Sequence, residues 1–216
     1  FTRASSATVV NKDGLIETVG SGEPRIDFKD NTKGALLLEP TRSNLIPYSE
    51  DFSQGYWTKG GSSVVSGFTS PKGDLSAFKL VEGTANEIHR ITSSNIITTD
   101  GVEITQTIFV KNNGRNWIRL RSTVTSTTPY VFYNLSNNTI GSTSNASGTI
   151  ETLGNDYKRL SITYTASGIN NNLELSLSQV NDNNLVAYQG DGTSGVYIYG
   201  AQLEQGSYPT SYIPNY

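Results

Sequence analysis

The 216-residue sequence has neither cysteine nor methionine and contains one histidine, His89. Without cysteine the chain has no disulfide, no thiolate metal ligand and no thiol nucleophile. A single histidine also excludes metal sites built from several histidines. Because the chain begins at Phe1 and lacks methionine throughout, we expect it to be a fragment or a processed product of a longer protein.

Charge is also scarce. Charged residues make up 16% of the chain, and 16 basic against 19 acidic residues give a net charge of −3. No dense basic stripe is present, which argues against nucleic-acid binding. No apolar run approaches the ~20 residues that cross a bilayer as a helix, so we expect no membrane insertion.

Short polar residues take the place of charge. Serine (26), threonine (25) and asparagine (20) fill about a third of the 216 positions. Their side chains bond to nearby backbone groups and compete with helix, so they favour strands and turns. No stretch shows a sustained 3.6-residue apolar period. This composition is typical of an extracellular all-β protein.

Apolar residues alternate with polar ones in several segments separated by turn signals. The clearest examples are residues 116–122, 157–164 and 173–177, whereas residues 196–203 are apolar on both faces, as in a central strand. This spacing of strands predicts an antiparallel β-sandwich over residues 44–216. Residues 1–43 form shorter runs, which we interpret as small β-hairpins that dock on the sandwich or link it to a neighbouring part.

Two of the predicted strands carry aromatic and basic side chains opposite their aliphatic face. Trp117, Arg119 and Arg121 alternate with aliphatic residues, and Tyr157 and Arg159 do the same in a second strand. Sugar rings stack on flat aromatic side chains, and their hydroxyls bond to arginine. These five residues are therefore the candidate ligand-binding residues. The alternative is that Trp117 packs under a loop or against a neighbouring subunit.

The patterns for catalysis are missing. No Gly-x-Ser-x-Gly turn is present, and we expect His89 to be a surface or loop residue. Glu50 and Asp51 are adjacent, so on a strand they would point to opposite faces and could not flank one glycosidic bond. We expect Trp57 to lie in the core. The sequence therefore predicts no catalytic residues and a chain that is not an enzyme.

Three segments together resemble a module of bacteriophage tail-fibre, head-fibre and related virion proteins. The body of that module is similar to jelly-roll carbohydrate-binding modules of the xylan- and glucan-binding type. The resemblance is carried by Thr2–Thr8 with Asp13–Ile16 and Glu23–Phe28, by Leu37–Ser53 with Trp57, and by Gly195–Glu204 with Pro209–Pro214.

The resemblance implies an antiparallel β-sandwich of jelly-roll type that binds a cell-surface or extracellular polysaccharide without catalysis, in a virion or extracellular setting. Two other interpretations stay open. One is a purely structural virion module, with a homotrimer formed through exposed aromatic residues. The other is an accessory module of a polysaccharide-degrading enzyme.

Related glycan-binding modules often hold a structural calcium ion with paired acidic residues near the last strand. Here Tyr199 and Gly200 stand in that stretch. We expect no cofactor; if calcium does bind, the carboxylates left to supply oxygen ligands are Glu50, Asp51 and Glu204.

Overall fold

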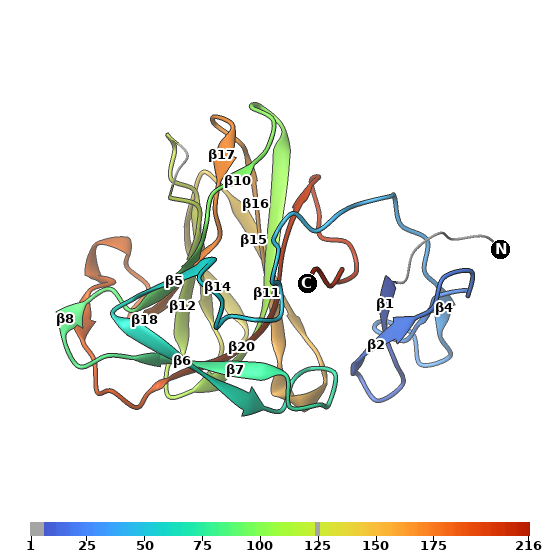
Figure 1. The fold of residues 1–216 in the computed structure, drawn as a ribbon, viewed down its shortest axis with the longest axis horizontal. Helices are drawn as coiled ribbons and strands as arrows, with labels where there is room; N and C mark the ends of the chain where they lie inside the picture. Colours follow the sequence, from blue (N-terminus) through green and yellow to red (C-terminus); the bar gives the residue numbers. More distant parts are fainter. Residues whose placement is uncertain (1–6, 124–125) are drawn as a thin grey trace.

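The computed structural model describes residues 7–123 and 126–216, and two six-stranded antiparallel sheets dominate it (Figure 1). One sheet, named the β11 sheet here, contains in spatial order β15 (Ser147–Thr152), β16 (Lys158–Thr165), β11 (Glu103–Asn113), β20 (Gly195–Gln205), β7 (Ala77–Glu82) and β6 (Ser62–Phe68). The other, the β12 sheet, contains β14 (Thr139–Ser144), β13 (Tyr130–Asn134), β12 (Trp117–Arg121), β18 (Glu174–Ser178), β9 (Arg90–Ser93) and β5 (Trp57–Gly60).

Successive long strands cross from one sheet to the other. The chain passes from β7 to β9, from β11 to β12, from β13 and β14 to β15 and β16, and from β18 to β20. The inner strands therefore lie in the order β16-β11-β20-β7 in one sheet and β13-β12-β18-β9 in the other. This is the strand order of a jelly roll, so the predicted fold class is confirmed.

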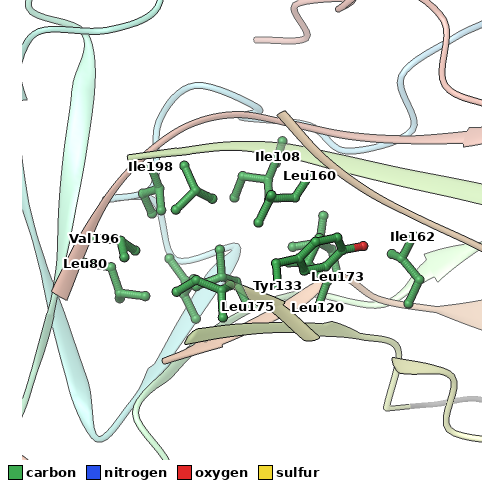
Figure 2. Close-up of a cluster of buried hydrophobic side chains, with 14 of the residues drawn as sticks. Leu80, Ile108, Leu120, Tyr133, Leu160, Ile162, Leu173, Leu175, Val196 and Ile198 are labelled. Carbon is green, nitrogen blue, oxygen red and sulfur yellow. The ribbon is translucent and has the colours of Figure 1, made fainter. Parts of the chain in front are cut away.

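The main core lies between the two sheets. It is built from the inward residue of each alternating pair, and Figure 2 shows its middle, where aliphatic side chains of both sheets surround the Tyr133 ring. Leu160 and Ile162 of β16 and Leu120 of β12 and Leu175 of β18 contribute to this layer from the two sheets. Trp57 is also buried here and packs on Phe52, which confirms the prediction for this tryptophan.

A second, smaller core lies on the outer face of the β11 sheet. Its members come from the N-terminal region, the sheet and the C-terminal tail: Ile16, Ala77, Phe109, Tyr157, Tyr199 and Tyr212. The N-terminal strands β1 (Ala7–Val10), β2 (Ile16–Val19), β3 (Ile26–Asp27) and β4 (Ala35–Leu36) form two small hairpins beside it (Figure 1). The predicted hairpin extension is therefore present.

Specific polar contacts attach this extension. Thr8 Oγ1 donates to the Tyr212 carbonyl at 2.5 Å, and Arg25 Nη1 bonds both Glu39 (2.6 Å) and Ser211 Oγ (2.8 Å). The hairpins and the C-terminal tail thus cover the outer face of the β11 sheet together.

The remaining elements are short. Two-residue strands pair β8 (Asn86–Glu87) with β19 (Tyr188–Gln189) and β10 (Ile96–Ile97) with β17 (Asn170–Asn171). Two 3-10 turns, η1 (Gly154–Asp156) and η2 (Asn183–Leu185), are the helical elements of the described residues. No helix in residues 7–123 and 126–216 has the length and apolar character needed to cross a membrane.

Candidate functional site

The outer face of the β12 sheet displays the polar side of β12. Ile118 and Leu120 are fully buried in the main core, while Trp117, Arg119 and Arg121 lie on the opposite face, as the alternation predicts. Register places Arg121 directly opposite Glu174 of β18. Glu174 is in turn opposite Thr92 of β9, so one row of polar residues crosses three strands.

Glu174 is the centre of an arginine cluster. Its carboxylate accepts from Arg121 Nε at 2.7 Å, from Arg119 Nη2 at 3.2 Å and from Ser176 Oγ at 2.8 Å. Arg90 Nε lies 3.6 Å from the same carboxylate. Because a buried charge is costly unless it is paired, these contacts explain how a fully buried glutamate is tolerated.

Glu174 and Arg119 both stay ionised at neutral pH. Burial alone would raise the pKa of Glu174, but the hydrogen bond and charge of Arg121 outweigh it and hold the pKa below its usual value. Burial lowers the pKa of Arg119 to about 10, which still leaves it protonated at pH 7. Arg90, Arg119 and Arg121 therefore face one carboxylate, a local excess of positive charge in an acidic chain.

The segment that follows β18, around Asn181 and Asn183, covers the part of this face near Trp117. Asn183 of η2 accepts a hydrogen bond from Arg119 Nη1 at 2.8 Å, and Asn181 Oδ1 accepts from the Ser142 backbone of β14 at 2.7 Å. Arg119 is only 1% exposed as a result. Its prediction as a ligand-binding residue is corrected: its guanidinium holds Glu174 and this segment in place.

Trp117 is half-buried at the edge of the same covering segment. An added Cβ on Gly141 would lie 2.7 Å from the Trp117 ring and would overlap Asn181 Oδ1, so the three residues are in close packing. This arrangement agrees with the alternative interpretation that Trp117 packs under a loop. Contact of Trp117 with a sugar stays a prediction.

Beyond the covering segment, the face opens into a groove of about 430 Å³. We name it the Arg121 groove. Its lining is Thr58, Arg90, Thr92, Ser93, Ser94, Asn95, Arg121, Thr123, Asn172 and Glu174. Tyr130 of β13 flanks it as the cross-strand neighbour of Arg121 and is half-buried. The groove therefore presents hydroxyls, amides and two arginines beside an aromatic ring.

Two arginines keep free donors in this groove. Arg121 uses Nε and Nη2 on Glu174, and Nη1 has no hydrogen bond within the described part of the chain. Arg90 makes only its ion pair with Glu174 there, and its side chain is 39% exposed. Its cross-strand partner is Gly60, where an added Cβ would lie 3.1 Å from Arg90 Nε, so the glycine leaves room for the guanidinium across β5.

Tyr157 and Arg159 lie elsewhere. Arg159 lies in β16 of the β11 sheet, and Tyr157 directly precedes that strand. Both therefore occupy the opposite outer face of the sandwich from Trp117. Tyr157 is fully buried and donates to the Thr69 carbonyl at 2.9 Å. The five candidate residues therefore do not share one surface, because strand alternation does not reveal which sheet a strand joins.

Arg159 is buried under the N-terminal extension. Its Nη2 bonds Thr107 Oγ1 at 3.2 Å, and its guanidinium lies 5.4 Å from the Phe109 ring centre. It lines a cavity of about 180 Å³ that also contains Glu39 and Glu151. Its position is that of a packing residue between the sheet and the hairpins.

The three candidate calcium ligands each have a partner of their own. Glu204 is buried and accepts from Thr210 Oγ1 at 2.7 Å, Glu50 pairs with Lys72 at 3.2 Å, and Asp51 accepts from Ser53. No group of three or more acidic or histidine side chains in residues 7–123 and 126–216 is arranged to hold a metal ion.

His89 lies in the loop between β8 and β9, as predicted, but it is buried there and not at the surface. Its ring nitrogens lie 2.5 Å from the Gly61 carbonyl and 3.1 Å from the Tyr188 carbonyl, and its ring meets that of Tyr188 edge-on. These contacts make His89 a polar crosslink between the start of β9 and the β8–β19 region.

The chain resembles known proteins in its structure and not in its sequence. No protein-family model matches the sequence, and no curated protein matches it. A matching solved structure is the N-terminal endo-1,4-beta-D-xylanase 10B of Clostridium thermocellum, with CBM22-1 and GH10 modules complexed with xylohexaose. It is 14% identical, with a TM-score of 0.44 over 80% of this chain and 30% of that one. The chain thus spans less than a third of that protein, and a similarity at this level assigns no ligand.

Sequence reasoning missed Glu174, Arg90 and Tyr130. The signal for Glu174 was present, because it is a lone carboxylate at the outward position of the alternating segment 173–177. Arg90 follows the buried His89, and Tyr130 is the first residue of β13. Their meeting at one groove depends on the pairing of β9, β18, β12 and β13.

Proposed function

We propose that this chain is a non-catalytic carbohydrate-binding module whose ligand lies in the Arg121 groove. The observation that carries the proposal is the open polar groove across β9, β18 and β12, with free donors on Arg90 and Arg121. Saccharides bind through many hydrogen bonds to such planar, fixed side chains. Tyr130, the half-buried cross-strand neighbour of Arg121, is the aromatic side chain on which we expect the apolar side of a sugar to stack.

The rigidity of the site supports the proposal. Arg121 is held by two hydrogen bonds to a buried carboxylate, so its remaining Nη1 donor is fixed before a ligand arrives. A fixed donor loses little conformational entropy on binding. The neighbouring hydroxyls of Thr58, Ser94 and Thr123 extend the same surface.

A phage-fibre or extracellular setting is part of this proposal and rests on the sequence resemblance. The accessory module of a polysaccharide-degrading enzyme differs from it only in what surrounds the chain. Sequencing of the parent gene on both sides distinguishes the two.

Binding is tested by affinity electrophoresis against neutral and acidic polysaccharides, followed by NMR titration with the oligosaccharide of the retained polymer. We expect amide shifts to concentrate on β9, β18 and the end of β12. Thr58→Ile, which removes a hydroxyl from the groove, should weaken binding about threefold to tenfold. The matched control Thr18→Ile, on an exposed position of β2, should leave binding unchanged.

Either of two results would contradict the proposal. One is the absence of retardation by every polymer tested. The other is a set of amide shifts confined to the N-terminal hairpins or to the start of β12 near Trp117.

A second candidate, a structural virion module, is favoured by a different surface. Ile26, Leu36 and Leu38 of the N-terminal extension are exposed, at 41%, 51% and 75%. Exposed apolar side chains of this size mark contact surfaces between proteins. A stable trimer in sedimentation equilibrium that dissociates on Leu38→Ser, together with no retardation by any polysaccharide, would support this candidate.

A further inference from the structure

The charges of the Arg121 groove are unbalanced. Among the described residues that line it, Glu174 is the single carboxylate, and it is shared by Arg90, Arg119 and Arg121. The other lining residues are neutral hydroxyl and amide side chains and carry no compensating charge. One anionic group entering the groove would bring the cluster closer to neutrality.

The free donors have the geometry for such a group. Arg90 contacts the carboxylate of Glu174 only at 3.6 Å, so its fork of N–H groups makes no hydrogen bond to any residue in 7–123 or 126–216. Arg121 Nη1 is likewise free among these residues. A guanidinium presents two parallel N–H donors, and these match two oxygens of a carboxylate or a sulfate. A single hydroxyl group can accept only part of this donor pair.

Arg90 is also oriented toward the groove. Gly60 opposite it leaves the space in which its side chain lies, and any larger residue there would meet Arg90 Nε and Cγ within 3.1–3.3 Å. The partly exposed guanidinium of Arg90 thus lies beside the buried carboxylate of Glu174, and both line the same groove.

We propose that the Arg121 groove selects acidic saccharides, with Arg90 and Arg121 as the specificity-determining residues that bind a sugar carboxylate or sulfate. This inference rests on the proposed function and narrows its ligand class. The anionic group lies between the two guanidinium forks, and the sugar hydroxyls meet the threonine, serine and asparagine side chains of the lining.

The central comparison of the test is between two polymers that differ in charge alone. Polygalacturonate and its fully methyl-esterified form share a backbone, and the ester removes the anion. Alginate is a second carboxylated polymer, κ-carrageenan carries sulfate without carboxylate, and hydroxyethylcellulose is neutral. Affinity electrophoresis and isothermal titration calorimetry with matching oligosaccharides, at 20 and 200 mM NaCl, give dissociation constants for each.

We expect binding to at least one acidic polymer and a loss of about tenfold or more on esterification of a carboxylated one. Arg90→Gln should weaken acidic binding about tenfold and leave the fold intact, because Arg90 donates no hydrogen bond within the described chain. Lys33→Gln, at an exposed site on the N-terminal extension, removes the same unit of charge and should change binding less than twofold. Binding to κ-carrageenan alone would identify sulfate as the anion.

The outcomes separate this inference from the proposed function. Equal binding to polygalacturonate and its ester, or retention by hydroxyethylcellulose alone, would overturn acidic selectivity and keep carbohydrate binding. Equal weakening by Arg90→Gln and Lys33→Gln would show nonspecific attraction and overturn the role of Arg90. The absence of binding to every polymer would overturn both.

Discussion

Arg121 and Glu174 face each other across β12 and β18 in register, with Arg121 Nε 2.7 Å from Glu174 Oε1. This pair fixes the floor of the groove, because the same carboxylate also holds Arg119 and attracts Arg90. A cross-strand pair on the outer face of a sheet is normally solvated, and here the segment around Asn183 has buried one side of it.

Replacement of Glu174 by glutamine tests the cluster. The variant leaves three arginines without their shared anion, and removal of one partner of a buried ion pair costs about 3–5 kcal/mol. We expect a fall of about that size in the free energy of unfolding by urea at pH 7. Glu103→Gln, at an exposed position of β11, is the control and should change stability by less than about 0.5 kcal/mol.

The same glutamate gives a pH dependence. The pKa of Glu174 is lowered in the folded state, so its stabilisation is complete above the unfolded pKa, near 4.5, and is lost as the pH falls through the lower folded value. The stability difference between the native chain and Glu174→Gln should therefore shrink below about pH 4.5. A difference that grows with acidification would contradict the assignment.

Tyr188→Phe probes the second buried carboxylate. Tyr188 donates to Glu82 Oε2 at 2.6 Å, beside the paired contacts of Arg115 at 2.6 and 2.5 Å. Burial raises the pKa of Glu82, and the bonds from Arg115 and Tyr188 together bring it below its usual value. We expect a loss of about 1–2 kcal/mol at pH 7 in thermal or urea unfolding. The loss should diminish below pH 4.5 as Glu82 protonates, whereas Tyr208→Phe at an exposed site should have no effect.

Gly200→Ala tests the packing of the second core beside the register shift between β11 and β20. Gly200 has φ +57°, and an added Cβ would lie 3.0 Å from the rings of Phe109 and Tyr212. Strain and crowding together should lower stability by about 1–3 kcal/mol. Gly55→Ala, where an added Cβ meets nothing within 4 Å, is the matched control for backbone entropy. Equal effects at the two glycines would contradict the packing described for Gly200.

Arg159→Met tests how much the buried charge of Arg159 contributes to the free energy of unfolding. Arg159 has no carboxylate within ion-pair distance among the described residues, and burial lowers its pKa. An apolar side chain of similar length keeps the contact with Phe109 and avoids the cost of burying the charge. We expect a change in unfolding free energy within about 1 kcal/mol. A loss above about 3 kcal/mol would indicate that the guanidinium has an essential partner.

Trp117→Ala distinguishes the two ends of β12. Trp117 and Arg121 are four residues apart, roughly 13 Å along a strand, and the covered Arg119 lies between them. We expect the variant to lose stability through the contact with Gly141 and to change saccharide affinity less than twofold. A strong loss of affinity measured by titration calorimetry, with the fold intact, would move the binding site to the start of the strand.

The sequence by itself determined the all-β class, the presence of a hairpin extension beside the sandwich, and which face of each strand is apolar. These follow from local physics: short polar residues disfavour helix, and a period of two sorts the side chains of β12 and β16 between two faces. Tertiary structure alone decided the site. Pairing brought Glu174 and Arg90 beside Arg121, the segment around Asn183 buried Arg119, and the N-terminal hairpins covered Tyr157 and Arg159. No local pattern encodes those outcomes, because sheet membership and the packing of a distant segment depend on long-range contacts that alternation does not specify.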